Sequence, residues 1–177
     1  MRLFADGIFS LLSMFLRDVG WPSVVGCFAA FLCAAVILQT VQGRRLTVRT
    51  VAYCAALSLY CTFVVAVTLL GRSPGLVSDA SQHPLAMTYA NEVEHLIDVA
   101  YNAMLFAPLG LLLAVRQGPL ASMAIVVLAT VAIEVVQLQT GRGLFEVSDI
   151  VGNVAGGVVG VCCALLVRRV LVRASST

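Results

Sequence analysis

The chain has 177 residues, of which 60% are hydrophobic and 11% are charged, with eleven basic and nine acidic side chains. A soluble domain carries about 25% charged residues, so this composition excludes an ordinary water-soluble globule. The mean hydropathy of +1.01 instead indicates a protein that lies mostly within a lipid bilayer. The net charge of +2 argues against nucleic acid as a partner.

Residues 1–18 predict an amphipathic helix that lies along the membrane surface. Their polar side chains recur at steps of three and four and therefore share one helix face. These residues are Arg2, Asp6, Ser10, Ser13 and Arg17. A cleaved signal peptide is the competing interpretation, which Asp6 and the missing A-x-A cleavage site disfavour.

Five stretches without charged side chains follow, at residues 19–43, 50–71, 99–115, 117–133 and 150–167. A helix needs about 20 apolar residues to cross the hydrocarbon core, so the first two stretches are long enough by themselves. The last three reach that length only if polar residues at their ends enter the membrane. We therefore predict an all-α fold, a polytopic membrane helix bundle of five transmembrane helices plus the N-terminal amphipathic interfacial helix.

The arginines of the short loops predict the orientation of these helices. All eleven basic residues are arginine, and seven of them follow the first, third and fifth spans: Arg44, Arg45, Arg49, Arg116, Arg168, Arg169 and Arg173. The other four belong to the opposite side: Arg2, Arg17, Arg72 and Arg142. The positive-inside rule therefore predicts an N-terminus outside and a C-terminus in the cytoplasm.

Carboxylates and amides pair at helical spacing in the last three spans. The pairs are Asp98 with Asn102, Glu134 with Gln137, and Asp149 with Asn153, and each pair shares one helix face. Alternating span directions bring all three pairs to the same depth, within about two turns of the outer surface. His95 precedes Asp98 by three residues, and Arg142 lies in the loop between the last two spans.

Three interpretations of this convergence compete. In the first, the groups only hold the helices together through interhelical hydrogen bonds, an ion pair of Arg142 and a helix cap at Ser148 or Asp149. In the second, Asp98, Glu134 and Asp149 bind a divalent cation. No sequence spacing identifies such a metal site, so we predict no resident cofactor and keep the cation as an alternative. In the third, the groups form an acid/base and anion site. Its catalytic candidates are Asp98, Glu134, Asp149 and His95, and its ligand-binding candidates are Asn102, Gln137, Arg142 and Asn153.

Two further features predict architecture. Pro108 and Gly110 lie midway along the third span, where the proline removes a backbone hydrogen bond and predicts a kink. Gly152, Gly156 and Gly160 recur at steps of four in the fifth span. Such a glycine surface permits close helix contact, and we favour contact within the chain over dimerisation. The six cysteines form no C-x-x-C motif, so neither a metal cluster nor a disulfide framework is predicted.

Three motifs follow one another in residues 51–172. They are an N-x-x-L-F-x-P-L-G helix at Asn102–Gly110, a helix with E-x-x-Q at Glu134–Gln137, and a short loop with Arg142 and Asp149 followed by N-x-x-G at Asn153–Gly156. In their order and spacing these motifs resemble the pattern of the VanZ-like proteins. The resemblance implies a four-helix transmembrane core in a multi-pass protein of the bacterial plasma membrane, with residues 19–43 as an additional transmembrane helix. The family is named for a protein that confers resistance to teicoplanin, but it supplies no catalytic residues to carry over.

The leading functional hypothesis is an envelope protein whose outer-leaflet polar cluster binds an amphiphile: a lipid, a lipid-linked wall precursor or a lipoglycopeptide. This would link it to glycopeptide resistance. The alternative is an intramembrane hydrolase or transferase that acts on a lipid-linked phosphate or acyl group. No G-x-S-x-G or H-E-x-x-H motif favours that enzyme. A transporter or channel ranks last, because few polar residues lie in the cytoplasmic half of the spans.

Overall fold

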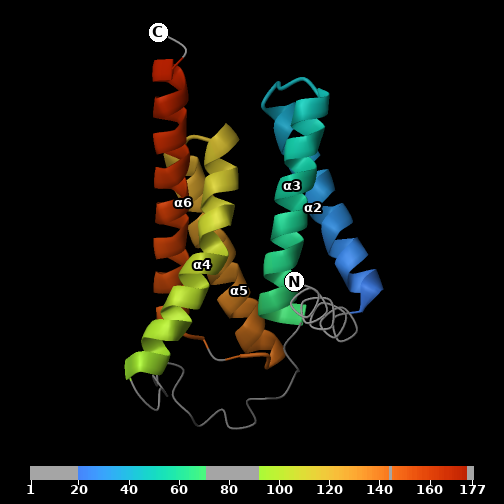
Figure 1. The fold of residues 1–177 in the computed structure, drawn as a ribbon. Helices are drawn as coiled ribbons and strands as arrows, with labels where there is room; N and C mark the ends of the chain where they lie inside the picture. The colour runs from blue at the N-terminus through green and yellow to red at the C-terminus, as the bar shows by residue number, and fades with distance from the viewer. Residues whose placement is uncertain (1–19, 71–91, 144, 175–177) are drawn as a thin grey trace, which may run out of the picture. The chain divides into compact units, whose positions relative to one another are not determined.

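The computed structural model describes residues 20–70, 92–143 and 145–174, apart from the side chains of residues 92, 94 and 95. All of its regular structure is helical (Figure 1). The elements in chain order are α2 (Trp21–Val41), α3 (Val48–Val65), the π-helical segment η1 (Ala66–Leu70), α4 (Glu92–Arg116), α5 (Pro119–Thr140) and α6 (Val147–Ala174).

Five helices among the described residues are long and apolar enough to cross a membrane, with α3 and η1 forming one of them. Large apolar side chains cover the outside of these helices: Leu128 is 70% exposed and Met104 is 71% exposed. Polar side chains such as Ser122 and Thr130 are instead fully buried. A bundle surrounded by hydrocarbon has this distribution, because lipid accepts apolar side chains and cannot hydrogen-bond to polar ones.

Helices α2 and α3 belong to the first of two compact units, Met1–Ser73. Pro22 stands in the first turn of α2, where its missing N–H costs nothing. The side-chain oxygen of Thr47 caps α3 by accepting from the N–H of Thr50 at 3.3 Å. Further along α3, Ser58 and Thr62 are buried, and each hydroxyl donates to the carbonyl four residues earlier. These buried hydroxyls are therefore satisfied within their own helix.

Helices α4, α5 and α6 form the second unit, Pro74–Thr177, in which α6 packs most extensively against α4 (Figure 1). Phe106 of α4, Val126 of α5 and Val161 of α6 are part of its buried core. Pro119 begins α5, and Gly141 ends it in the left-handed conformation with φ of 63°. The short connection from Gly141 to α6 makes α5 antiparallel to its neighbours, as the alternating spans predict.

The prediction of five long apolar helices is confirmed. The last three extend beyond their charge-free stretches, as expected: α4 contains Asp98, α5 contains Glu134 and α6 contains Arg168. The predicted interfacial helix at residues 1–18 lies outside the described residues. Pro108 stands within α4, which continues through it to Arg116.

Candidate functional site

The contact between α4 and α6 positions the predicted site, and glycines make it close. A Cβ atom added at Gly152 would lie 2.8 Å from the carbonyl oxygen of Val99 and 3.0 Å from Cβ of Asn102. At Gly156 it would collide with the backbone of Ala103, and at Gly160 with the backbone of Ala107. Each step of four along α6 matches a step of four along α4, so the two helices run parallel with their backbones almost touching. The predicted packing of this glycine surface within the chain is confirmed.

The first polar link across this contact joins Asn102 of α4 to Asp149 of α6. Nδ2 of Asn102 donates to Oδ1 of Asp149 at 2.6 Å, and both side chains are half-buried. Asp149 stands in the first turn of α6, where the positive end of the helix dipole favours a carboxylate. A charged acceptor and a short distance make this a strong hydrogen bond at a position that is not sealed from its surroundings.

A second link lies one turn deeper and joins α6 to α5. Nδ2 of Asn153 donates to the hydroxyl of Thr130, which is fully buried. Asn153 itself is only 2% exposed. The amide oxygen of Asn153, Oδ1, is also buried and has no hydrogen-bond partner among the described residues. The amide is thus held through its nitrogen and leaves one acceptor available.

Glu134 ties the α5–α6 connection to the bundle. Its side chain is 1% exposed, and Oε2 accepts from the backbone N–H of Glu146 at 3.0 Å. At the other end of the connection, the N–H of Arg142 donates to the carbonyl of Gln137 at 2.9 Å. Both ends of this loop are therefore hydrogen-bonded to the last turns of α5, which determines where α6 begins.

The polar residues of these links, together with Gln137, form a group that we call the polar cluster: Asn102, Thr130, Glu134, Gln137, Glu146, Asp149 and Asn153. Gln137 lies one turn after Glu134 and is 2% exposed. Asp98 lies on α4 one turn before Asn102 and is exposed, while Arg142 is half-buried. The side chain of His95 lies outside the described residues.

The described residues contain no group of three or more His, Cys, Asp and Glu side chains that could hold a metal ion. Asp98 is exposed, and Glu134 is buried against the backbone of the α5–α6 connection. This part of the chain therefore does not assemble the carboxylate set that the cation hypothesis requires.

Two members of the polar cluster were not among the predicted site residues. Thr130 pairs with Asn153, and the backbone of Glu146 pairs with Glu134. Thr130 could have been found, because it stands four residues before Glu134 on the same face of α5. The backbone contact of Glu146 follows from the path of the loop, which no spacing reveals.

Comparison with families of known proteins gives one family match. The family model VanZ/LLP1 matches residues 57–168, which run from α3 into the last turns of α6. The chain belongs to the VanZ/LLP1 family. It is accordingly a multi-span membrane protein.

The match to VanZ/LLP1 covers every member of the polar cluster and excludes α2. No curated protein matches the chain in sequence. No solved structure matches it either.

Proposed function

We propose that this VanZ/LLP1 protein binds the polar headgroup of a membrane amphiphile at the Asn102–Asp149 end of the polar cluster, on the outer face of a bacterial plasma membrane. The observation that carries the proposal is the short Asn102–Asp149 hydrogen bond between two half-buried side chains. A purely structural link would be best protected by full burial. This pair instead remains accessible at the edge of the bundle, with exposed Asp98 one turn before it.

The chemistry of the accessible groups defines which headgroup would fit. The carboxylates of Asp98 and Asp149 accept hydrogen bonds and carry negative charge, so they suit hydroxyl or ammonium donors. Arg142 carries the opposite charge and suits a phosphate or carboxylate. A headgroup with both kinds of group, such as an amino- or hydroxyl-bearing phosphate ester, would engage both sides.

The surface beside this pair supports an amphiphile rather than a water-soluble ligand. Tyr101 and Met104 follow Asp98 at steps of three along α4, and their side chains are 66% and 71% exposed. An apolar chain lying against them would remain in hydrocarbon while its headgroup reached Asp98, one turn before Asn102. A lipid, a lipid-linked wall precursor and a lipoglycopeptide all have this construction, and either of the last two would connect the protein to glycopeptide resistance.

Native mass spectrometry of the purified full chain with a polar lipid extract of the cell envelope, and separately with teicoplanin, tests the proposal. Asp149→Asn keeps an acceptor for Asn102 but removes the charge, and Arg142→Gln removes the cation. We expect each to weaken retention of the bound amphiphile at least ten-fold, because hydrogen bonds to charged groups contribute about 1.5–3 kcal/mol.

Gln139→Ala is the matched control, since Gln139 is an exposed side chain in the same last turns of α5. It should retain the amphiphile like the parent protein. Absence of any retained amphiphile, or equal retention by Asp149→Asn, Arg142→Gln and the parent, would refute the proposal.

A further inference from the structure

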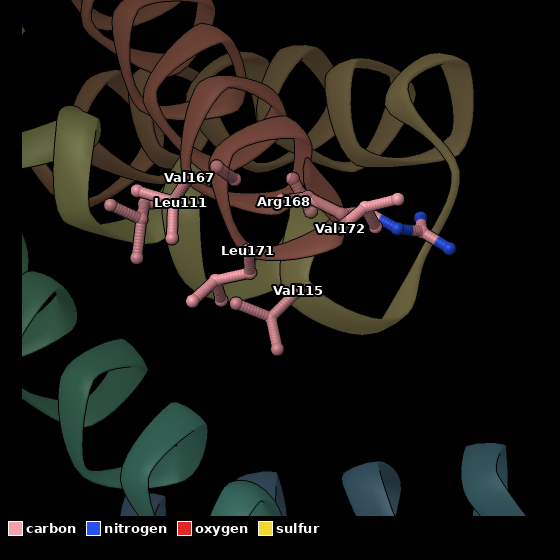
Figure 2. A pocket seen from close by; sticks show the side chains of 8 residues that line it. Leu111, Val115, Val167, Arg168, Leu171 and Val172 are labelled. Carbon is pink, nitrogen blue, oxygen red and sulfur yellow. The ribbon is translucent and has the colours of Figure 1, made fainter. Parts of the chain in front are cut away.

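A hollow lies between α4 and α6 at the opposite end of these helices from the polar cluster. Its volume is about 560 Å³, and Leu111, Ala114, Val115, Ala164, Val167, Arg168, Leu171 and Val172 line it. Seven of these side chains are apolar. Figure 2 shows the nitrogen atoms of Arg168 at one edge of the group, turned away from Leu111 and Val115.

A second hollow of about 450 Å³ adjoins the first, because Arg168 and Val172 line both. Its other lining residues are Leu165, Arg169 and Arg173. Three arginines thus stand within six consecutive positions of α6, and all three are exposed. An apolar hollow therefore opens beside a concentrated positive charge.

We propose that these two hollows together form a binding site for an anionic phospholipid. The phosphate would lie at Arg168 and Arg169, and one acyl chain would lie in the hollow between Leu111 and Leu171. Arginine forms bidentate hydrogen bonds with phosphate, and basic pockets between membrane helices recognise anionic lipid headgroups. The orientation proposed above places these arginines at the cytoplasmic leaflet.

The charge and the apolar lining together favour a phospholipid over other anions. A free phosphate would gain nothing from the seven apolar side chains, and a zwitterionic lipid would bring an ammonium group toward three arginines. The site also differs from the polar cluster, whose accessible groups include two carboxylates. Loss of lipid at one site would therefore leave the other intact.

Native mass spectrometry of the full chain with phosphatidylglycerol and phosphatidylcholine of identical acyl chains tests this proposal. We expect preferential retention of phosphatidylglycerol, reduced about five-fold in Arg168→Gln, since one arginine near an anionic lipid contributes about 1 kcal/mol. Ala164→Trp, which fills the hollow, should reduce retention while leaving every arginine in place. Thermal unfolding of each variant in detergent checks that it is folded.

Arg49→Gln and Val158→Trp are the matched controls, because both side chains are exposed and neither lines either of these two hollows. Equal losses in Arg49→Gln and Arg168→Gln would indicate unspecific attraction and overturn the proposal. Equal retention of the two lipids would overturn it as well. So would displacement of phosphatidylglycerol by millimolar inorganic phosphate, or a dimer that dissociates in Ala164→Trp without change in bound lipid.

Discussion

The polar side chains inside the second unit need hydrogen-bond partners within the protein. Asn102, Asn153 and Glu134 each bond to a partner on another segment of the chain. Hydrocarbon offers no alternative partner, so a broken bond leaves an unsatisfied group. Interhelical hydrogen bonds in membranes nevertheless contribute only about 0.6 kcal/mol on average, because unfolded segments in the bilayer also find partners. Stability alone is thus a weak reason to place so many polar groups together.

Thr130→Val removes the hydroxyl that accepts from Asn153 and keeps the size of the side chain. Because the amide nitrogen of Asn153 is then left in the core without this acceptor, we expect the free energy of unfolding to fall by about 1 kcal/mol. Chemical or thermal unfolding in detergent micelles measures the change.

Thr140→Val is the control, since the hydroxyl of Thr140 is exposed and bonds to the carbonyl of Val136 in its own helix. It should change the free energy of unfolding by less than about 0.5 kcal/mol. If Thr130→Val is equally harmless, the Asn153 bond does not stabilise the bundle.

At the scale of elements, the close packing of α6 against α4 requires glycines at the contact, because any larger side chain there would separate the two helices. Gly156 and Gly160 lie directly on the backbone of α4, and Gly157 lies against Val126 of α5. Without a hydrophobic force between helices in lipid, close van der Waals packing of this kind must hold them together. The same closeness brings Asn102 within hydrogen-bond distance of Asp149, so the packing also determines the geometry of the candidate site.

Gly156→Ala should therefore destabilise the protein by about 3 kcal/mol or more, because the added methyl meets backbone that cannot move aside cheaply. Gly156→Leu should prevent folding in detergent. Thermal unfolding and size-exclusion chromatography of the purified variants measure both effects.

Gly26→Ala in α2 provides the comparison, since a Cβ there has nothing within 4 Å. It should be neutral or stabilising by up to about 1 kcal/mol, as alanine is the better helix former. A folded Gly156→Ala protein as stable as Gly26→Ala would contradict the packing argument.

At the scale of the whole molecule, the near-neutral charge conceals a strong asymmetry. In the proposed orientation, seven arginines face the cytoplasm, while four arginines and all nine carboxylates face outward. The small net charge of +2 is therefore the difference between a basic side and an acidic side. Both proposed lipid sites follow this division, with carboxylates at the outer one and arginines at the inner one.

Single cysteines at Gly143 and Gly118 test this orientation, in a background whose six native cysteines are replaced by alanine. A membrane-impermeant maleimide applied to intact cells should label Gly143→Cys and leave Gly118→Cys unlabelled until the cells are opened. The positive-inside rule is the physical reason, since Arg116 lies beside Gly118 and the C-terminal arginines lie on the same side. The reverse labelling pattern would invert the proposed topology and move the polar cluster to the cytoplasmic side.

The sequence by itself determined the five long apolar helices and their approximate ends. The thickness of the bilayer requires about 20 apolar residues per span. Charged side chains inside the membrane are costly, so spans can be recognised in the sequence as stretches without them. The spacing of four between glycines also predicted a glycine contact within the chain. The alternating direction of the spans predicted a common depth for the three carboxylate–amide pairs. The spacing accordingly predicts Asn102, Asp149, Asn153 and Glu134 as candidate residues, and each takes part in a hydrogen bond between segments.

Only the tertiary structure decided which atoms meet. Whether Asn153 bonds to Thr130 and Asn102 to Asp149 depends on the rotation and lateral distance of each helix, which hydropathy does not encode. The structure likewise separated exposed Asp98 from buried Glu134, two carboxylates that the sequence treats alike. The physical reason is that burial in a bundle is set by contacts between segments, whereas insertion into the bilayer is set by each segment alone.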